Sequence, residues 1–213
     1  MGISMPRLIE IERAGVIAPG RAAVLDIGVS NLHNATAEQV LYFFEKYPKR
    51  PVDDALRARA RDLADRTRRG HPGGHTFLAE VFAETRIEYL ALDVFPGPST
   101  RIFDLNFDPA PPDLAGRFDL VLNFGTTEHV FSQYNAFKAI HDFLKVGGHV
   151  YHQIPTTGFF NHGYFKYHPR MFEELAVANC YHVVELGLDT MGFWGFEEYY
   201  GRLEHLKPPP RFR

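Results

Sequence analysis

The residues best suited to chemistry stand at the ends of four apolar runs. The first run ends in the Asp-Ile-Gly of residues 26–28, and the second ends in Asp93. The third ends in the Asp-Leu-Asn of residues 104–106, and the fourth leads into the polar segment 123–129. Burying so many polar groups without partners would be costly, so these run ends predict a ligand or a dense hydrogen-bond network.

Each end suits a different part of a nucleoside ligand. Gly28 lets backbone amides approach a ligand, and the side chains of Ser30 and Asn31 can donate to it. Asp93 can accept two hydrogen bonds from the paired hydroxyls of a ribose, which would serve NAD equally well. The carboxylate of Asp104 or the amide two residues later can meet the exocyclic amino group of adenine.

A second set of polar residues follows the fourth run, and these residues are candidates for contact with a substrate. His129 is the candidate general base because an imidazole titrates near physiological pH, although the Glu128-His129 pair also fits a structural role in shaping the pocket. Residues 156–169 carry five aromatic side chains and fit either an acceptor-binding wall or a packing loop; Asn161, His162 and Tyr164 are its candidate contacts. Eleven histidines show no standard metal-site spacing, so we expect no metal.

The elements that position these residues are strands and helices in alternation. Runs of β-branched, aromatic and aliphatic residues predict six strands, at 22–28, 87–93, 100–106, 118–124, 148–154 and 181–187. Periodic patterns predict helices at 130–145 and 168–179, the first with a stripe of Val130, Tyr134, Phe137, His141 and Leu144. This order predicts a doubly wound, mostly parallel, Rossmann-like α/β sheet of six or seven strands, with 192–198 as the weak seventh.

The first two predicted strands are separated by far more than the roughly 20 to 30 residues of a simple βαβ unit. Residues 36–84 show about three helical patterns and no convincing strand, so they predict a helical insertion. In its middle helix, Asp53 and Asp54 suit a helix start, and the apolar stripe consists of Val52, Leu56, Ala60 and Leu63. We expect one domain over residues 1–213, whose insertion covers the site or makes a homodimer contact.

The composition is typical of a globular protein and argues against several other classes of protein. The chain has 213 residues, 45% of them hydrophobic and 23% charged, which is ordinary for a globular protein. It shows neither a membrane span nor a signal peptide, so the expected location is cytoplasmic. One cysteine excludes an intrachain disulfide, and the net charge of -3 argues against nucleic acid and favours a small-molecule partner.

These motifs together resemble the class I S-adenosylmethionine-dependent methyltransferases. VLDIGVSN resembles their glycine-containing first motif, although it has one glycine where the fuller pattern has two or three. YLALDV resembles their ribose-binding motif, and IFDLN resembles their adenine-contacting motif. FDLVLNFGTTEHV followed by FLKVGGHVYHQIP is similar to their fourth and fifth strands.

The resemblance implies S-adenosylmethionine as cofactor and methyl transfer to a small-molecule acceptor. It implies the following cofactor contacts: Asp26, Gly28, Ser30 and Asn31 near the methionine part, Asp93 and Val94 at the ribose, Asp104 and Leu105 at the adenine, and Asn123 and Phe124 along the cofactor. Two of these residues have an alternative role without a ligand. The alternative for Asp26 is to cap the following turn, and the alternative for Asp104 is to be a carboxylate of a surface loop. Two other functions remain open, a non-catalytic methyltransferase-like subunit and an NAD-dependent oxidoreductase that lacks the usual G-x-G-x-x-G turn.

Overall fold

The computed structural model describes residues 2–17, 22–68, 71, 74–158 and 161–188. These residues fall into two compact units, which divide between Tyr167 and His168. The larger unit holds every predicted site residue. Each unit is described by itself, and the expectation of a single domain over residues 1–213 stays a prediction.

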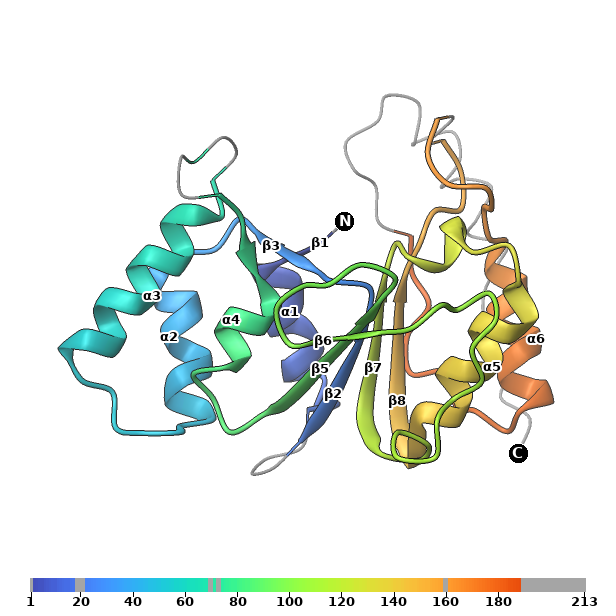
Figure 1. Cartoon of the computed structure of the whole chain (residues 1–213), viewed down its shortest axis with the longest axis horizontal. Helices are drawn as coiled ribbons and strands as arrows, with labels where there is room; N and C mark the ends of the chain where they lie inside the picture. Colours follow the sequence, from blue (N-terminus) through green and yellow to red (C-terminus); the bar gives the residue numbers. More distant parts are fainter. Residues whose placement is uncertain (1, 18–21, 69–70, 72–73, 159–160, 189–213) are drawn as a thin grey trace. The chain divides into compact units, whose positions relative to one another are not determined.

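The larger unit is built around a parallel sheet of five strands in the order β6-β5-β2-β7-β8 (Figure 1). The strands are β2 (Ala23–Ile27), β5 (Glu88–Asp93), β6 (Thr100–Ile102), β7 (Phe118–Phe124) and β8 (Leu144–Gln153). All five were predicted, although β6 is shorter than its apolar run and β8 begins earlier. All residues of β2 are buried, as expected for a strand inside a sheet that is covered on both faces.

Helices cover both faces of this sheet, so the predicted doubly wound α/β class is confirmed (Figure 1). One face carries α1 (Met5–Arg13) and α4 (Leu78–Phe82), whose apolar side chains share a core with Val24 and Leu120 of the sheet. The other face carries α5 (Gln133–Phe143). A 3-10 turn, η1 (Thr127–His129), leads from β7 toward α5.

The predicted stripe on α5 is wrong by one helical position. The buried residues of α5 are Ala136, Ala139, Ile140 and Phe143, whereas Tyr134 is 81% exposed. Two of the four buried residues are alanines, which let the helix backbone lie close to the sheet. The sequence-based stripe followed bulky side chains, because bulk is the usual sign of a buried helical face.

The insertion contains the predicted helices and also one strand of a second small sheet, whose other two strands precede the insertion in the chain. Its helices are α2 (Ala37–Lys46), α3 (Asp54–Arg66) and α4; the small sheet has the order β1-β3-β4, with β1 (Gly2–Ser4), β3 (Asn31–His33) and β4 (Thr76–Phe77). Asp53 caps α3 by accepting a hydrogen bond from the Leu56 amide at 2.8 Å. Leu56, Ala60 and Leu63 are buried as predicted, whereas Val52 precedes α3 and is half-buried. The two-residue strand β4 is too short for a periodic signal.

The smaller unit contributes one described helix, α6 (Pro169–Ala178), at the predicted position. Residues 181–187 form no strand, so the predicted sixth strand is wrong. The predicted weak strand at 192–198 lies outside the described residues. Within the described part of the chain, no helix has the length and apolar character needed to cross a membrane.

Candidate functional site

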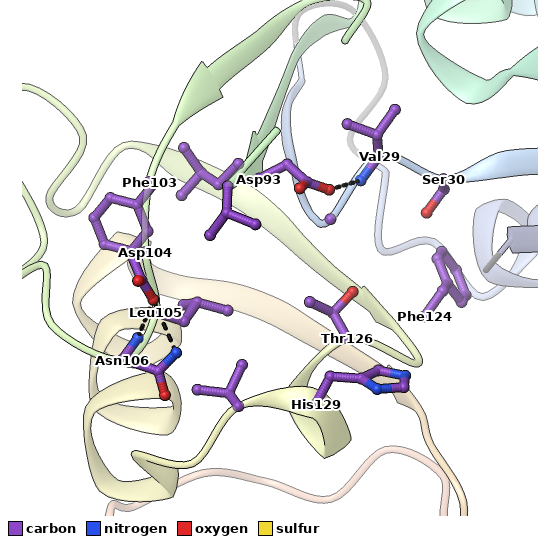
Figure 2. A pocket seen from close by; sticks show the side chains of 14 residues that line it. Val29, Ser30, Asp93, Phe103, Asp104, Leu105, Asn106, Phe124, Thr126 and His129 are labelled. Atoms are coloured by element: carbon purple, nitrogen blue, oxygen red, sulfur yellow. Dashed lines mark hydrogen bonds between the residues drawn. The ribbon is translucent and has the colours of Figure 1, made fainter. Parts of the chain in front are cut away.

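A pocket opens at the carboxyl ends of the parallel strands, where an open α/β sheet binds its ligands (Figure 2). It is lined by Gly28, Val29, Ser30, Leu92, Asp93, Val94, Phe103, Asp104, Leu105, Asn106, Phe124, Thr126, His129 and Val130. These residues come from the ends of β5 and β7 and from the segments that follow β2, β5, β6 and β7. Four of the predicted run ends therefore meet in one place.

The loop after β2 forms one wall of the pocket. Gly28 has φ +95°, a conformation that residues with a side chain rarely adopt, and its amide donates to the Leu92 carbonyl at 2.7 Å. The Thr126 hydroxyl donates to the Ile27 carbonyl at 2.6 Å. A Cβ on Gly28 would lie 2.4 Å from that hydroxyl oxygen, so this position requires glycine for space as well as conformation.

Asp93 lies across the pocket from Thr126 and joins two loops (Figure 2). One carboxylate oxygen accepts from the Val29 amide at 3.1 Å, and the other accepts from the Phe95 amide at 3.0 Å. An ionised carboxylate offers about four lone-pair sites. Two of them are engaged by these amides, so Asp93 retains acceptors for the two hydroxyls of a ribose.

Asp104 and Asn106 organise the wall nearest α5. Asp104 accepts hydrogen bonds from the backbone amide and the side-chain amide of Asn106, at 2.8 and 2.9 Å (Figure 2). The Asn106 carbonyl oxygen in turn accepts from the amides of Phe131 and Ser132, just before α5 begins. Beside them Phe103, Leu105 and Val130 provide apolar surface, which suits a flat base flanked by hydrogen-bonding groups.

Asp26 is fully buried behind the loop and does not line the pocket. Its carboxylate accepts from the Ser30 amide and hydroxyl at 3.0 Å each, and from the Tyr89 hydroxyl at 2.6 Å. Desolvation raises the pKa of Asp26 to about 7, although these three donors favour the charged form. Asp26 therefore fits the alternative reading of a cap that holds Ser30 in the pocket wall.

Asn123 is also buried behind the pocket and organises the turn after β7. Its carbonyl oxygen accepts from the amides of Thr126 and Thr127, and its side-chain nitrogen donates to the Thr127 hydroxyl at 2.9 Å. The same nitrogen lies 3.0 Å from His152 Nδ1, which must accept because an amide nitrogen only donates. Desolvation lowers the pKa of His152 to about 4, so this ring is neutral at pH 7.

Asn31 does not lie in the pocket lining, because the chain enters β3 rather than a helix after Ser30. It pairs with Gly2 of β1 in the small sheet. The expected contact of Asn31 with the methionine part of a cofactor therefore has no support in the geometry. Of the other expected cofactor contacts, Gly28, Ser30, Asp93, Val94, Asp104, Leu105 and Phe124 line the pocket.

Of the expected substrate residues, His129 lines the pocket, and Glu128 and His162 lie beside it. Glu128 is buried, and its Oε1 lies 3.3 Å from His162 Nε2 and 4.0 Å from His129 Nε2. Burial raises the pKa of Glu128. The rings of Phe131 and Tyr164 stack at a centroid distance of 4.5 Å, and both side chains are mostly exposed. Asn161 is exposed and does not line the pocket.

Two features of the site were not predicted. Val29, Leu92, Phe103, Thr126 and Val130 line the pocket although none was named as a contact; all five lie within the motifs that indicated the site. The three groups of Glu128, His129 and His162 lie within 4.8 Å of one another, an arrangement that can hold a metal ion. Sequence spacing gave no sign of it, because His162 lies on a separate loop.

Residues 30–211 match the family model described as a methyltransferase domain. The chain belongs to this methyltransferase-domain family, which confirms the resemblance to the class I enzymes and supports a methyltransferase activity in general. The match covers every pocket residue except Gly28 and Val29. No curated protein and no solved structure matches the chain.

Proposed function

We propose that this protein is an S-adenosylmethionine-dependent methyltransferase that acts on a small-molecule acceptor. The observation that carries the proposal is the meeting of Gly28, Asp93 and Asp104 around one pocket at the carboxyl ends of the strands. Asp93 has free lone pairs for ribose hydroxyls, and the apolar surface beside Asp104 suits adenine. These residues fit the cofactor that the family typically uses.

The charges that line the pocket favour this cofactor over a dinucleotide. Asp93 and Asp104 carry the negative charge, and no lysine or arginine is among the lining residues in the described part of the chain. A sulfonium and an ammonium group are cations and would be attracted here, whereas the pyrophosphate of NAD would be repelled. The pocket chemistry therefore argues against the oxidoreductase alternative.

S-adenosylmethionine would supply the methyl group: a lone pair of the acceptor forms the new bond while the carbon–sulfur bond breaks and leaves its electron pair on sulfur. The protein would mainly align the acceptor and exclude water. Phe131 and Tyr164 offer a stacked aromatic surface at the rim for the acceptor. His129 lines the pocket, and its imidazole is placed to take the proton that the acceptor loses.

Calorimetric titration with S-adenosylmethionine, S-adenosylhomocysteine and NADH tests this proposal. We expect micromolar binding of the first two ligands, no binding of NADH, and at least a tenfold weaker affinity in Asp93→Ala. The matched control is Asp113→Ala, which removes an exposed carboxylate that pairs with Arg101 away from the pocket lining. Failure of the wild-type chain to bind either sulfur compound would overturn the proposal and leave a non-catalytic subunit, or an oxidoreductase if NADH bound.

A further inference from the structure

Two imidazoles and one carboxylate converge beside the pocket, and one of the imidazoles, His129, lines it. Glu128 and His129 belong to η1, which directly follows β7, and His162 comes from the loop after β8. Nε2 of His162 and Nε2 of His129 lie 3.3 and 4.0 Å from the same oxygen, Glu128 Oε1. Ligands bound to one ion at about 2.1 Å are roughly 3 to 4 Å apart, so these spacings suit a shared cation.

The buried carboxylate of Glu128 is the second observation that points to a ligand. Its side chain is 1% exposed, and its Oε2 is buried without a hydrogen-bond partner among the described residues. An unsatisfied carboxylate oxygen in such a place is strongly unfavourable unless a cation or proton compensates it. A hydrogen bond between Glu128 and His162 alone leaves this oxygen unexplained.

The loop that carries His162 is fixed onto Glu128 by backbone contacts. The Glu128 carbonyl accepts from the amides of Tyr164 and Phe165, at 2.7 and 3.2 Å. Gly163 has φ +67°, and a Cβ there would lie 2.7 Å from Glu128 Cγ. The loop therefore approaches this closely only with glycine at 163, and the approach holds His162 beside the carboxylate before any ligand arrives.

We propose that Glu128, His129 and His162 form a binding site for one divalent first-row transition-metal ion, such as Zn²⁺ or Mn²⁺. Two nitrogen ligands and one oxygen ligand favour such an ion over Mg²⁺ or Ca²⁺, which prefer oxygen ligands. Three protein ligands leave at least one coordination position open, as in catalytic metal sites. His129 also lines the cofactor pocket, so the site lies beside the place proposed for methyl transfer.

This site changes the role of His129 and indicates the class of acceptor, an inference that rests on the proposed function. Once Nε2 of His129 binds a metal, its lone pair is not available to take a proton from the acceptor. The ion would instead bind an acceptor hydroxyl and lower its pKa, so that the oxygen attacks as an alkoxide or phenoxide and its proton leaves to solvent. The acceptor is therefore an oxygen nucleophile.

Calorimetric titration of the chelator-stripped full chain with Zn²⁺, Mn²⁺ and Mg²⁺, without cofactor, tests the site directly. We expect one Zn²⁺ or Mn²⁺ per chain, bound at least tenfold more tightly than Mg²⁺. Glu128→Gln, His129→Ala and His162→Ala should each weaken the binding at least tenfold. The control His182→Ala removes an exposed histidine of the smaller unit and should bind the ion like wild type.

Circular dichroism of each variant separates a lost ligand from a lost fold. The His129 side chain is 41% exposed, so His129→Ala should keep the fold even if Glu128→Gln does not. Wild-type affinity in a folded His129→Ala variant, or no binding of any of the three ions by the wild-type chain, would overturn the proposal. Cofactor binding measured in excess chelator is a separate readout, so failure of the metal site is distinguishable from failure of the proposed function.

Discussion

The carboxylate of Asp93 at the end of β5 accepts a hydrogen bond from the backbone amide of Val29, at 3.1 Å, and so fixes the loop that follows β2. Its second oxygen accepts from Phe95. The residue proposed to bind the ribose therefore also shapes the neighbouring wall of the pocket, which the loop after β2 forms. A substitution that keeps the size of the side chain therefore tests both roles.

Asp93→Asn should weaken S-adenosylmethionine binding at least tenfold and also lower the free energy of unfolding by about 1 to 3 kcal/mol. The amide group offers one acceptor oxygen where two backbone amides need one each, so one amide loses its partner. Calorimetry and urea unfolding measure the two effects. Asp113→Asn, which removes an exposed ion pair with Arg101, should change stability by less than about 1 kcal/mol. Equal effects of the two substitutions would contradict this role of Asp93.

Gly28→Ala should be far more destabilising than Gly116→Ala. Both glycines have a positive φ, which costs an alanine about 1 to 2 kcal/mol, but only at Gly28 does the new Cβ meet an atom, Thr126 Oγ1 at 2.4 Å. We expect Gly116→Ala to cost about 1 to 2 kcal/mol and Gly28→Ala to cost about 3 kcal/mol or more, with loss of cofactor binding. Urea unfolding measures the difference. A Gly28→Ala variant as stable as Gly116→Ala would show that the loop relaxes freely.

Asp26 should make the folded protein less stable as the pH rises from about 4 to about 7. The unfolded carboxyl loses its proton near its ordinary pKa of 3.8, whereas the folded one keeps it until about pH 7. The stabilising contribution is therefore complete below pH 4 and lost above pH 7, a change of up to about 4 kcal/mol. Subtracting the unfolding free energies of Asp26→Asn from those of wild type at each pH isolates this contribution. A flat difference between pH 4 and 7 would rule it out.

His152 should act in the opposite direction over nearly the same range. Its pKa is lowered from 6.5 to about 4 in the folded protein, so its contribution is complete above pH 6.5 and is lost as the pH falls to 4. The loss should reach about 3 kcal/mol relative to His152→Gln. Glutamine keeps an acceptor for the side-chain nitrogen of Asn123 and does not titrate. If wild type and His152→Gln respond identically to acid, the ring is accessible to water when folded.

The strands of the main sheet could be predicted because a sheet covered on both faces needs nearly continuous apolar runs. The run at 118–124 coincides with β7. Residues 181–187 show the same composition but form no strand, since composition reports the preference of a segment and not whether a neighbouring strand is present to pair with it. The strand β4 was missed for a different reason: it pairs with β3, but its two residues are too few to give a periodic signal.

The location of the site could be predicted, but the direction of each side chain could not. Asp93 and Asp104 line the pocket as expected, whereas Asp26 and Asn123 point into the protein behind it. The residues that line the pocket and those that lie behind it all stand near the end of a strand. A shift of one or two positions along the chain there decides whether a side chain contacts a ligand or makes an internal hydrogen bond. His162 joins Glu128 only through the path of the loop after β8, which no local pattern encodes.

The order of the main sheet bears on how the chain folds as it is synthesised. The central strand β2 pairs on its two sides with β5 and β7, both of which come later in the chain. At a synthesis rate of about 5 to 20 residues per second, β2 waits several seconds for its first neighbour in the sheet. During that interval its apolar side chains have only the elements that precede β5 to pack against, among them the helices α1 to α4. Substitutions in the insertion should therefore lower the yield of folded protein during expression, even where they leave the pocket untouched.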